Sequence, residues 1–188
     1  TGVKEAIFAA LDRSSRGKAH RSVKSYNNHV GVPLSLARMP ARAKFGVFEM
    51  GMSNAGEIAG LTAQVRPHVA VITTIAPAHI ENLGSEEAIA DAKAEIFEGL
   101  ESGGTAIIPF DSPHYARLRA KAEQHAGHVV SFGLGAGADV RAVDVEELGL
   151  DGSRARLVTA AGERDLRHHQ DVARGGSAAT AAAQPPAQ

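Results

Sequence analysis

The segment His68–Phe110, HVAVITTIAPAHIENLGSEEAIADAKAEIFEGLESGGTAIIPF, decides the fold because it joins two apolar strands through one helix. His68–Pro77 is β-branched and continuously apolar, which is typical of a strand buried on both faces of a parallel sheet. Four apolar residues then recur at helical spacing: Ile89, Ala92, Ile96 and Leu100. Gly104–Phe110 is a second apolar run. The order strand, helix, strand predicts two parallel strands joined by a right-handed crossover.

The same alternation continues on both sides of this segment. Two further short apolar runs predict strands at Phe45–Gly51 and His128–Gly133. Helices are predicted at Thr1–Ser15, Asn28–Ala37, Gly56–Val65 and Pro113–His125. Strands that alternate with helices in this way predict an α/β fold with a mostly parallel, doubly wound sheet.

The pattern changes after Val140. VRAVDVEEL and SRARLVTA alternate around Asp151–Gly152, which predicts an antiparallel hairpin that extends the sheet. We therefore expect one domain over residues 1–170, cut off at its N-terminus because no methionine precedes the first helix. Residues 171–188 contain no leucine, isoleucine or aromatic residue, so we expect a low-complexity, disordered tail or the product of a frameshift.

Composition excludes several classes of function. The net charge is −1, so no global positive field attracts nucleic acid. The chain has no cysteine, which rules out disulfides and thiolate metal sites. No apolar run approaches a membrane span and no signal peptide is visible, so we expect a cytoplasmic location without membrane insertion. Metal ligands would be carboxylates, histidines or hydroxyls, which suit magnesium.

Lys93 interrupts the apolar face of the helix in the deciding segment. It lies four residues after Ile89 and four before Phe97. Burial favours the neutral form of a lysine, which can attack a substrate or carbon dioxide, and the resulting carbamate could hold a metal. The simpler alternative is a lysine that extends its ammonium group to water. Ser85 is positioned to cap this helix.

Two further candidates follow predicted strands. Glu49 ends the strand Phe45–Gly51, and His79 follows the strand His68–Pro77. Ligands of open α/β sheets collect at the carboxyl ends of the strands, so these side chains could form a metal pair. The alternatives are a helix cap for Glu49 and an ordinary loop histidine for His79.

The last candidates lie at helix starts. In a phosphate-binding loop, the lysine is followed by a threonine or serine that opens a helix and ligates magnesium. Thr1 opens a predicted helix, so it could have this role. Asn27 and Asn28 precede a predicted helix. One of them suffices as a cap, which leaves the other, together with Ser25, for contact with a ligand.

Four strings together resemble the central ATP-binding domain of the Mur ligases: SYNNHVGVPLSL, FEMGMSNAGEI, ITTIAPAHIENLGS and AKAEIF. The resemblance covers Thr1–Arg167 and is greatest to members that add D-alanyl-D-alanine to UDP-N-acetylmuramoyl-tripeptide. It implies ATP and Mg²⁺ as cofactors. It implies magnesium ligands at Thr1, Glu49, His79 and Lys93, with Lys93 carbamylated, and muramoyl-peptide contacts at Ser25, Asn27 and Asn28.

The resemblance also implies a reaction. ATP activates the substrate carboxylate as an acyl phosphate, and the incoming amine displaces phosphate, in the synthesis of peptidoglycan precursors by a cytoplasmic monomer. The phosphate-loop glycines and lysine are not in this sequence, and no asparagine follows Asn82 to contact adenine. The chain alone is therefore expected to be inactive. The alternatives are another Mur ligase or folylpolyglutamate synthetase, a noncatalytic nucleotide-binding fold, or the translation of a damaged gene.

Overall fold

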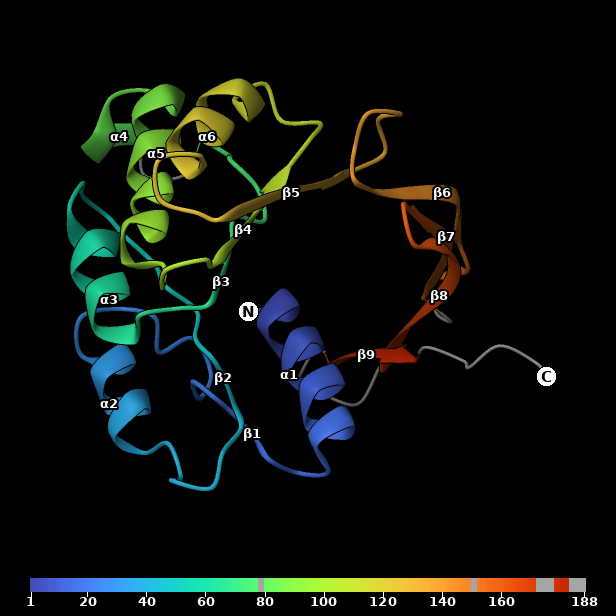
Figure 1. The fold of residues 1–188 in the computed structure, drawn as a ribbon, viewed down its shortest axis with the longest axis horizontal. Coiled ribbons are helices and arrows are strands. Elements are labelled where there is room, and N and C mark those ends of the chain that lie inside the picture. The colour runs from blue at the N-terminus through green and yellow to red at the C-terminus, as the bar shows by residue number, and fades with distance from the viewer. Residues whose placement is uncertain (78–79, 150–151, 172–177, 183–188) are drawn as a thin grey trace.

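The computed structural model describes residues 1–77, 80–149, 152–171 and 178–182, with side chains described as far as residue 167 (Figure 1). The helices are α1 (Gly2–Ser15), α2 (Gly31–Ala37), α3 (Glu57–Val65), α4 (Ile80–Leu83), α5 (Glu86–Ala94), η1 (Glu95–Gly99, a 3₁₀ helix) and α6 (Tyr115–Ala122). The strands are β1 (Ala19–Arg21), β2 (Phe45–Val47), β3 (Val69–Val71), β4 (Thr105–Pro109), β5 (His128–Gly133), β6 (Val140–Glu147), β7 (Ser153–Thr159), β8 (Gly162–Asp171) and β9 (Ala178–Ala182).

The strands form two sheets. A larger sheet has the order β3-β4-β5-β6-β7-β8-β9, parallel from β3 to β6 and antiparallel from β6 to β9. A smaller sheet contains the parallel pair β1 and β2. The predicted α/β fold with a mainly parallel sheet is confirmed. The predicted hairpin is also present, because Val140 pairs with Thr159 and Glu147 pairs with Ser153.

Several elements differ from the expectation. The strands β1 and β8 were not predicted, because β1 has three residues and β8 is rich in charged and polar residues, so neither has an apolar pattern. The helix predicted from Ser85 divides into α5 and the 3₁₀ helix η1. Its predicted cap is confirmed, because the Ser85 side chain accepts a hydrogen bond from the Ala88 amide. Within the tail, the backbone of Ala178–Ala182 pairs with β8 as β9.

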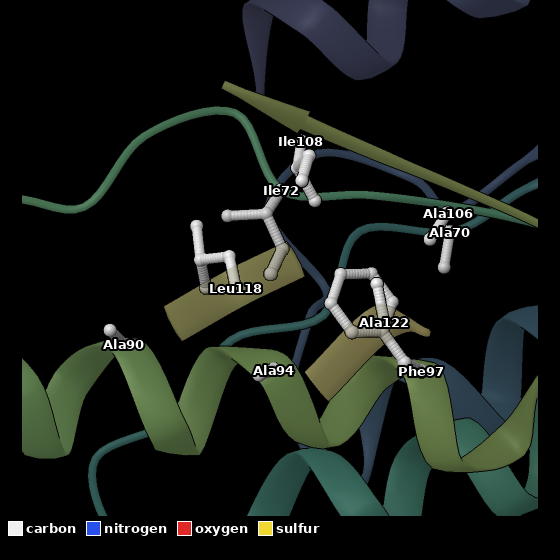
Figure 2. Packing of buried hydrophobic residues seen from close by; sticks show 9 residues of the cluster. All are labelled: Ala70, Ile72, Ala90, Ala94, Phe97, Ala106, Ile108, Leu118 and Ala122. Atoms are coloured by element: carbon white, nitrogen blue, oxygen red, sulfur yellow. The ribbon is translucent and has the colours of Figure 1, made fainter. Parts of the chain in front are cut away.

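The main core lies between β3 and β4 and the helices α5, η1 and α6 (Figure 2). Its buried members are Ala70, Ile72, Ala90, Ala94, Phe97, Ala106, Ile108, Leu118 and Ala122. Alanines on both the strands and the helices let the two layers approach closely, and Phe97 fills the space between them. A second cluster of Met52, Ile58, Ile89 and Ala92 joins α3 to the other face of α5. Among the helices that the structure describes, none is long and apolar enough to span a membrane.

Candidate functional site

The first group of candidate residues meets where β1 and β2 end. Because these strands are parallel, their carboxyl ends lie at the same edge of the small sheet. Ser22 follows β1, and its amide donates to the carbonyl of Val47 at the end of β2 (3.0 Å). The Glu49 amide donates to Ser22 Oγ at 3.4 Å. The backbone therefore places the Glu49 carboxylate at this edge, as the sequence predicts.

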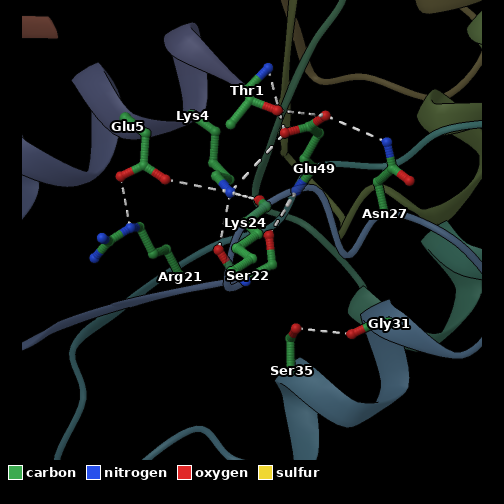
Figure 3. Close-up of polar contacts among 10 residues, drawn as sticks. All are labelled: Thr1, Lys4, Glu5, Arg21, Ser22, Lys24, Asn27, Gly31, Ser35 and Glu49. Atoms are coloured by element: carbon green, nitrogen blue, oxygen red, sulfur yellow. Dashed lines mark hydrogen bonds and ion pairs between the residues drawn. The ribbon is translucent and has the colours of Figure 1, made fainter. Parts of the chain in front are cut away.

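Two sequence-predicted residues, Thr1 and Asn27, converge on that carboxylate (Figure 3). The Thr1 hydroxyl and the Asn27 amide nitrogen both donate to Glu49 Oε1, each at 3.3 Å. The other oxygen, Oε2, lies 3.4 Å from the backbone nitrogen of Thr1. Oε2 is buried and has no hydrogen-bond partner among the described residues. Thr1 is the N-cap residue of α1, but its side chain makes no capping bond, so its hydroxyl is directed to Glu49 instead.

This arrangement fits a hard divalent cation. Hydroxyl and carboxylate oxygens are the donors that Mg²⁺ prefers, and a buried carboxylate oxygen without a partner has its lone pairs available. Within the described ranges, no group of three histidine, aspartate or glutamate side chains lies close enough to hold a metal. His79, the predicted partner of Glu49, lies outside the described residues. The structure therefore shows two of the four predicted ligands together.

Lys93 lies on α5, among the residues of the larger sheet's helical layer. Its Nζ donates to the carbonyl of Thr74, just beyond β3, at 2.8 Å. The side chain is half-buried, and this burial lowers the pKa of Lys93. The ammonium does reach a polar partner, and desolvation still increases the fraction of neutral amine.

The remaining predicted residues lie in the loop between β1 and α2. Ser25 is exposed. The Asn28 side chain accepts from the amides of Val30 and Gly31 at the start of α2 (3.1 and 2.9 Å), which is the capping role expected for one of the two asparagines. A Cβ on Gly31 would lie 2.7 Å from the Tyr26 backbone, so only glycine lets α2 approach this loop so closely.

Sequence reasoning missed the charged residue that lies beneath this site. Lys4 is the only buried residue of α1, with 5% of its surface exposed, although the apolar Val3 beside it is 48% exposed. Lys4 precedes Ile7 by three residues and Leu11 by seven, so helical spacing places it on the same face of α1 as these two apolar residues. This is the same signal that singled out Lys93.

Lys4 is also part of a network of ion pairs. Its Nζ lies 3.3 Å from Glu5 Oε1, and Glu5 Oε2 pairs with Arg21 Nε at 2.7 Å. The Arg21 guanidinium lies over the ring of Phe8, 4.0 Å from its centroid. These contacts attach α1 to β1 and fix the position of its N-terminal turn at the site.

Comparison with known proteins gives a consistent result. A family model described as the Mur ligase middle domain matches residues 1–167. The UDP-N-acetylmuramoyl-tripeptide–D-alanyl-D-alanine ligase of Bacillus subtilis is 42% identical over 113 residues, which are 60% of this chain and 24% of that protein. The ligase of the same name from Synechocystis is 38% identical over 153 residues, 81% of this chain and 33% of the relative.

Comparison of the fold with solved structures points to the same group of ligases. A crystal structure of MurF from Acinetobacter baumannii superposes with a TM-score of 0.79 at 30% identity, over 88% of this chain and 35% of that one. The chain thus spans about a quarter to a third of the length of the curated relatives that it matches.

Proposed function

This chain belongs to the Mur ligase middle domain family, and we propose that it is the nucleotide-binding part of a ligase that adds D-alanyl-D-alanine to UDP-N-acetylmuramoyl-tripeptide. The observation that carries this proposal is the contact of the Thr1 hydroxyl with the Glu49 carboxylate. It joins the N-terminus of a helix to the carboxyl end of a parallel strand. The free backbone N–H groups at a helix N-terminus favour a phosphate group, and ligands of α/β sheets bind at the carboxyl ends of the strands. The names of the Bacillus and Synechocystis relatives supply the substrates.

We propose that residues 1–170 act as one central domain, to whose larger sheet the described segment Ala178–Ala182 of the low-complexity tail adds the edge strand β9. Because the chain spans only part of its relatives' length, the contacts with the UDP end and with the incoming amine are assigned to other parts of the ligase. The same proposal includes a cytoplasmic location, a monomeric enzyme and no nucleic-acid partner. It also includes the expectation that the 188-residue chain alone has no ligase activity.

The proposed reaction has two steps. A carboxylate oxygen of the tripeptide attacks the γ-phosphorus of ATP, so that an O–P bond forms, the bond to the β-phosphate oxygen breaks, and ADP leaves. The amine of the dipeptide then attacks the acyl carbon, a C–N bond forms, phosphate leaves with the electrons of the C–O bond, and the amine loses one proton to solvent. Phosphoryl transfer of this kind depends on positioning and on neutralising negative charge.

Magnesium, when bound, would supply that neutralisation between the phosphates and the substrate carboxylate. The Thr1 hydroxyl and the Glu49 carboxylate would hold it, and His79 and Lys93 are the further proposed ligands. Asn27 holds one Glu49 oxygen by its hydrogen bond, so the other oxygen keeps a fixed direction. We assign Ser25 and Asn28, in the same loop as Asn27, to contact with the muramoyl peptide.

For Lys93, the proposal includes a carbamate. The neutral amine attacks carbon dioxide, an N–C bond forms, and one proton passes to water, which converts a cation into an anionic oxygen ligand. The burial that lowers the Lys93 pKa supports this step because it raises the population of neutral amine. A carbonyl signal in ¹³C NMR after addition of labelled bicarbonate, lost in Lys93→Met, would test it. A wild-type spectrum without that signal would contradict it.

The function is tested with the full gene product that carries this sequence. Purified protein is incubated with ATP, magnesium, the UDP-muramoyl-tripeptide and D-alanyl-D-alanine, and phosphate and product are measured together. We expect one phosphate released for each amide formed, as shown by mass spectrometry of the product. Phosphate release that does not depend on the dipeptide, or amide formation with a different amine only, would overturn the assignment.

A further inference from the structure

Lys4 is a buried charge that the proposed reaction does not use. Its ammonium donates to the carbonyl oxygens of Ser22, at 2.9 Å, and of Lys24. It also lies 3.3 Å from Glu5 Oε1 and 4.0 Å from Glu49 Oε2. An ammonium group has three hydrogens to donate, so two carbonyls and a neighbouring carboxylate satisfy it without water. Figure 3 shows the group between α1, the strand ends and the loop after β1.

The carbonyls that Lys4 binds belong to the loop that carries the proposed substrate contacts. Ser22 and Lys24 lie in the same six-residue stretch as Ser25 and Asn27, and Lys24 immediately precedes Ser25. Lys24 has a φ of 51°, in the left-handed region that a lysine seldom adopts, so this backbone needs outside contacts to hold it. The bond from Lys4 to the Lys24 carbonyl is one such contact.

Lys4 also faces the oxygen that would hold the metal. At 4.0 Å its ammonium is within ion-pair distance of Glu49 Oε2 but beyond hydrogen-bond distance. The positive charge therefore attracts the carboxylate towards α1, and the lone pairs of Oε2 stay available. Asn27 and Thr1 hold the other oxygen, so the carboxylate is fixed from both sides.

Lys4 does more than neutralise one nearby carboxylate, because it donates to two carbonyls of one loop and lies close to two carboxylates. Replacing a whole buried ion pair with apolar side chains commonly costs little folding free energy, whereas removing only the ammonium leaves its acceptors unpaired. Methionine is similar in length to lysine, but it has no hydrogen to donate and cannot orient two carbonyls and a carboxylate at once. The geometry of the loop and of Glu49 is what requires an ammonium group.

We propose that Lys4 is a positioning residue that fixes the loop Ser22–Asn28 and the Glu49 carboxylate relative to the N-terminus of α1. For catalysis, this inference rests on the proposed function, because it makes Lys4 the link between the muramoyl-peptide loop and the magnesium carboxylate. The positioning of the loop and of Glu49 by Lys4 is a property of the folded chain, so it can be tested without measuring ligase activity.

The first test measures amide hydrogen exchange in the 188-residue chain and in Lys4→Met. The amides of Ser22, Tyr26 and Gly51 donate to carbonyls of β2 or of this loop, so they report its order. In Lys4→Met we expect them to exchange about tenfold faster, while the Ile72 amide, bonded to Ile107 in the larger sheet, is unchanged. Lys18→Met is the matched control, since Lys18 is exposed on the turn after α1. Unchanged exchange at all three reporters in folded Lys4→Met would overturn the proposal.

A second measurement needs no substitution and stands if Lys4→Met does not fold. Brief acetylation of the native chain, followed by mass spectrometry, gives the relative reactivity of each lysine. We expect Lys4 to react at least about tenfold more slowly than the exposed Lys18, because its nitrogen is enclosed and bonded. Equal reactivity of the two lysines in the folded chain would overturn the proposal.

The third test uses the full gene product once its wild type shows the proposed ligase activity. Lys4→Met is expected to lower kcat/KM for the muramoyl peptide about tenfold, with the KM for D-alanyl-D-alanine within about twofold of wild type. An equal fall in kcat/KM for both substrates, or no fall in either, would overturn the catalytic part of the proposal. Failure of the wild type would instead refute the proposed function and leave the exchange and acetylation results as the test of the link.

Discussion

The β3–β4 layer and the edge of the small sheet are held together by different kinds of contact. Between β3, β4 and the helices α5 and α6, the buried side chains are alanine, isoleucine, leucine and phenylalanine. At the ends of β1 and β2, the fully or nearly buried residues include Lys4 and Ser22, and the contacts are hydrogen bonds and ion pairs. Apolar packing tolerates small shifts, whereas a polar network requires defined donor and acceptor positions. We therefore expect the first region to provide most of the stability and the second to provide the geometry of the site.

The largest difference between the two regions is expected at Phe97, in the apolar region. Its side chain is fully buried between the sheet and the helices, so Phe97→Ala removes apolar contacts and leaves a cavity. We expect the free energy of unfolding to fall by about 3–5 kcal/mol in denaturant titrations. Val145→Ala, at a position that is 56% exposed, is the control and should change it by less than about 0.5 kcal/mol. A loss of less than about 1 kcal/mol for Phe97→Ala would show that this layer does not supply the stability.

The sequence predicts the apolar region well for the same physical reason. Helical and strand periodicity report which face is buried, so the strand at Gly104–Phe110 and the helix with Ile89 were found from pattern alone. The cap at Ser85 was found because its chemistry is local. None of these inferences needed contacts between segments that are distant in the sequence.

The site was predicted only in part because its contacts join distant segments. Glu49 could be placed from the end of its strand, but its bond to Thr1 spans 48 positions of sequence. The strand β1 has no apolar pattern, so the loop that it positions could not be placed beside Glu49. Lys4 was missed although its spacing on α1 gave the same signal as Lys93 on α5.

Glu49→Gln tests the second region. The amide keeps the size of the side chain and one acceptor for Thr1 and Asn27, but it loses the negative charge that would hold magnesium. In the full gene product we expect ligase activity to fall about 100-fold or more, while the free energy of unfolding changes by less than about 1 kcal/mol. Steady-state kinetics and denaturant titration measure the two quantities. A stability loss as large as that of Phe97→Ala would mean that the polar site, too, serves mainly to hold the fold together.

The smallest expected effect concerns a polar contact at the border of the apolar region, at Asp139. Its carboxylate accepts from the Ser131 hydroxyl and amide at 2.6 and 2.8 Å, and these bonds lower the pKa of Asp139. Because the pKa is lower in the folded state, ionised Asp139 stabilises the fold above the unfolded pKa of about 3.9. This stabilisation is lost as the pH falls through the pKa of the folded state. The advantage of wild type over Asp139→Asn should therefore shrink between pH 6 and pH 2.

This advantage should stay under about 1 kcal/mol because Asp139 is exposed and solvent screens its charge. Denaturant titrations across that pH range measure it, with the exposed Glu98→Gln as the control. Ser131 is itself buried on β5, so its hydroxyl needs a hydrogen-bond partner at every pH. Part of the stabilisation by the Ser131–Asp139 hydrogen bond is therefore independent of pH. A difference between wild type and Asp139→Asn that stays constant with pH would assign the whole contact to that pH-independent part, and the charge of Asp139 would then contribute nothing to the apolar region.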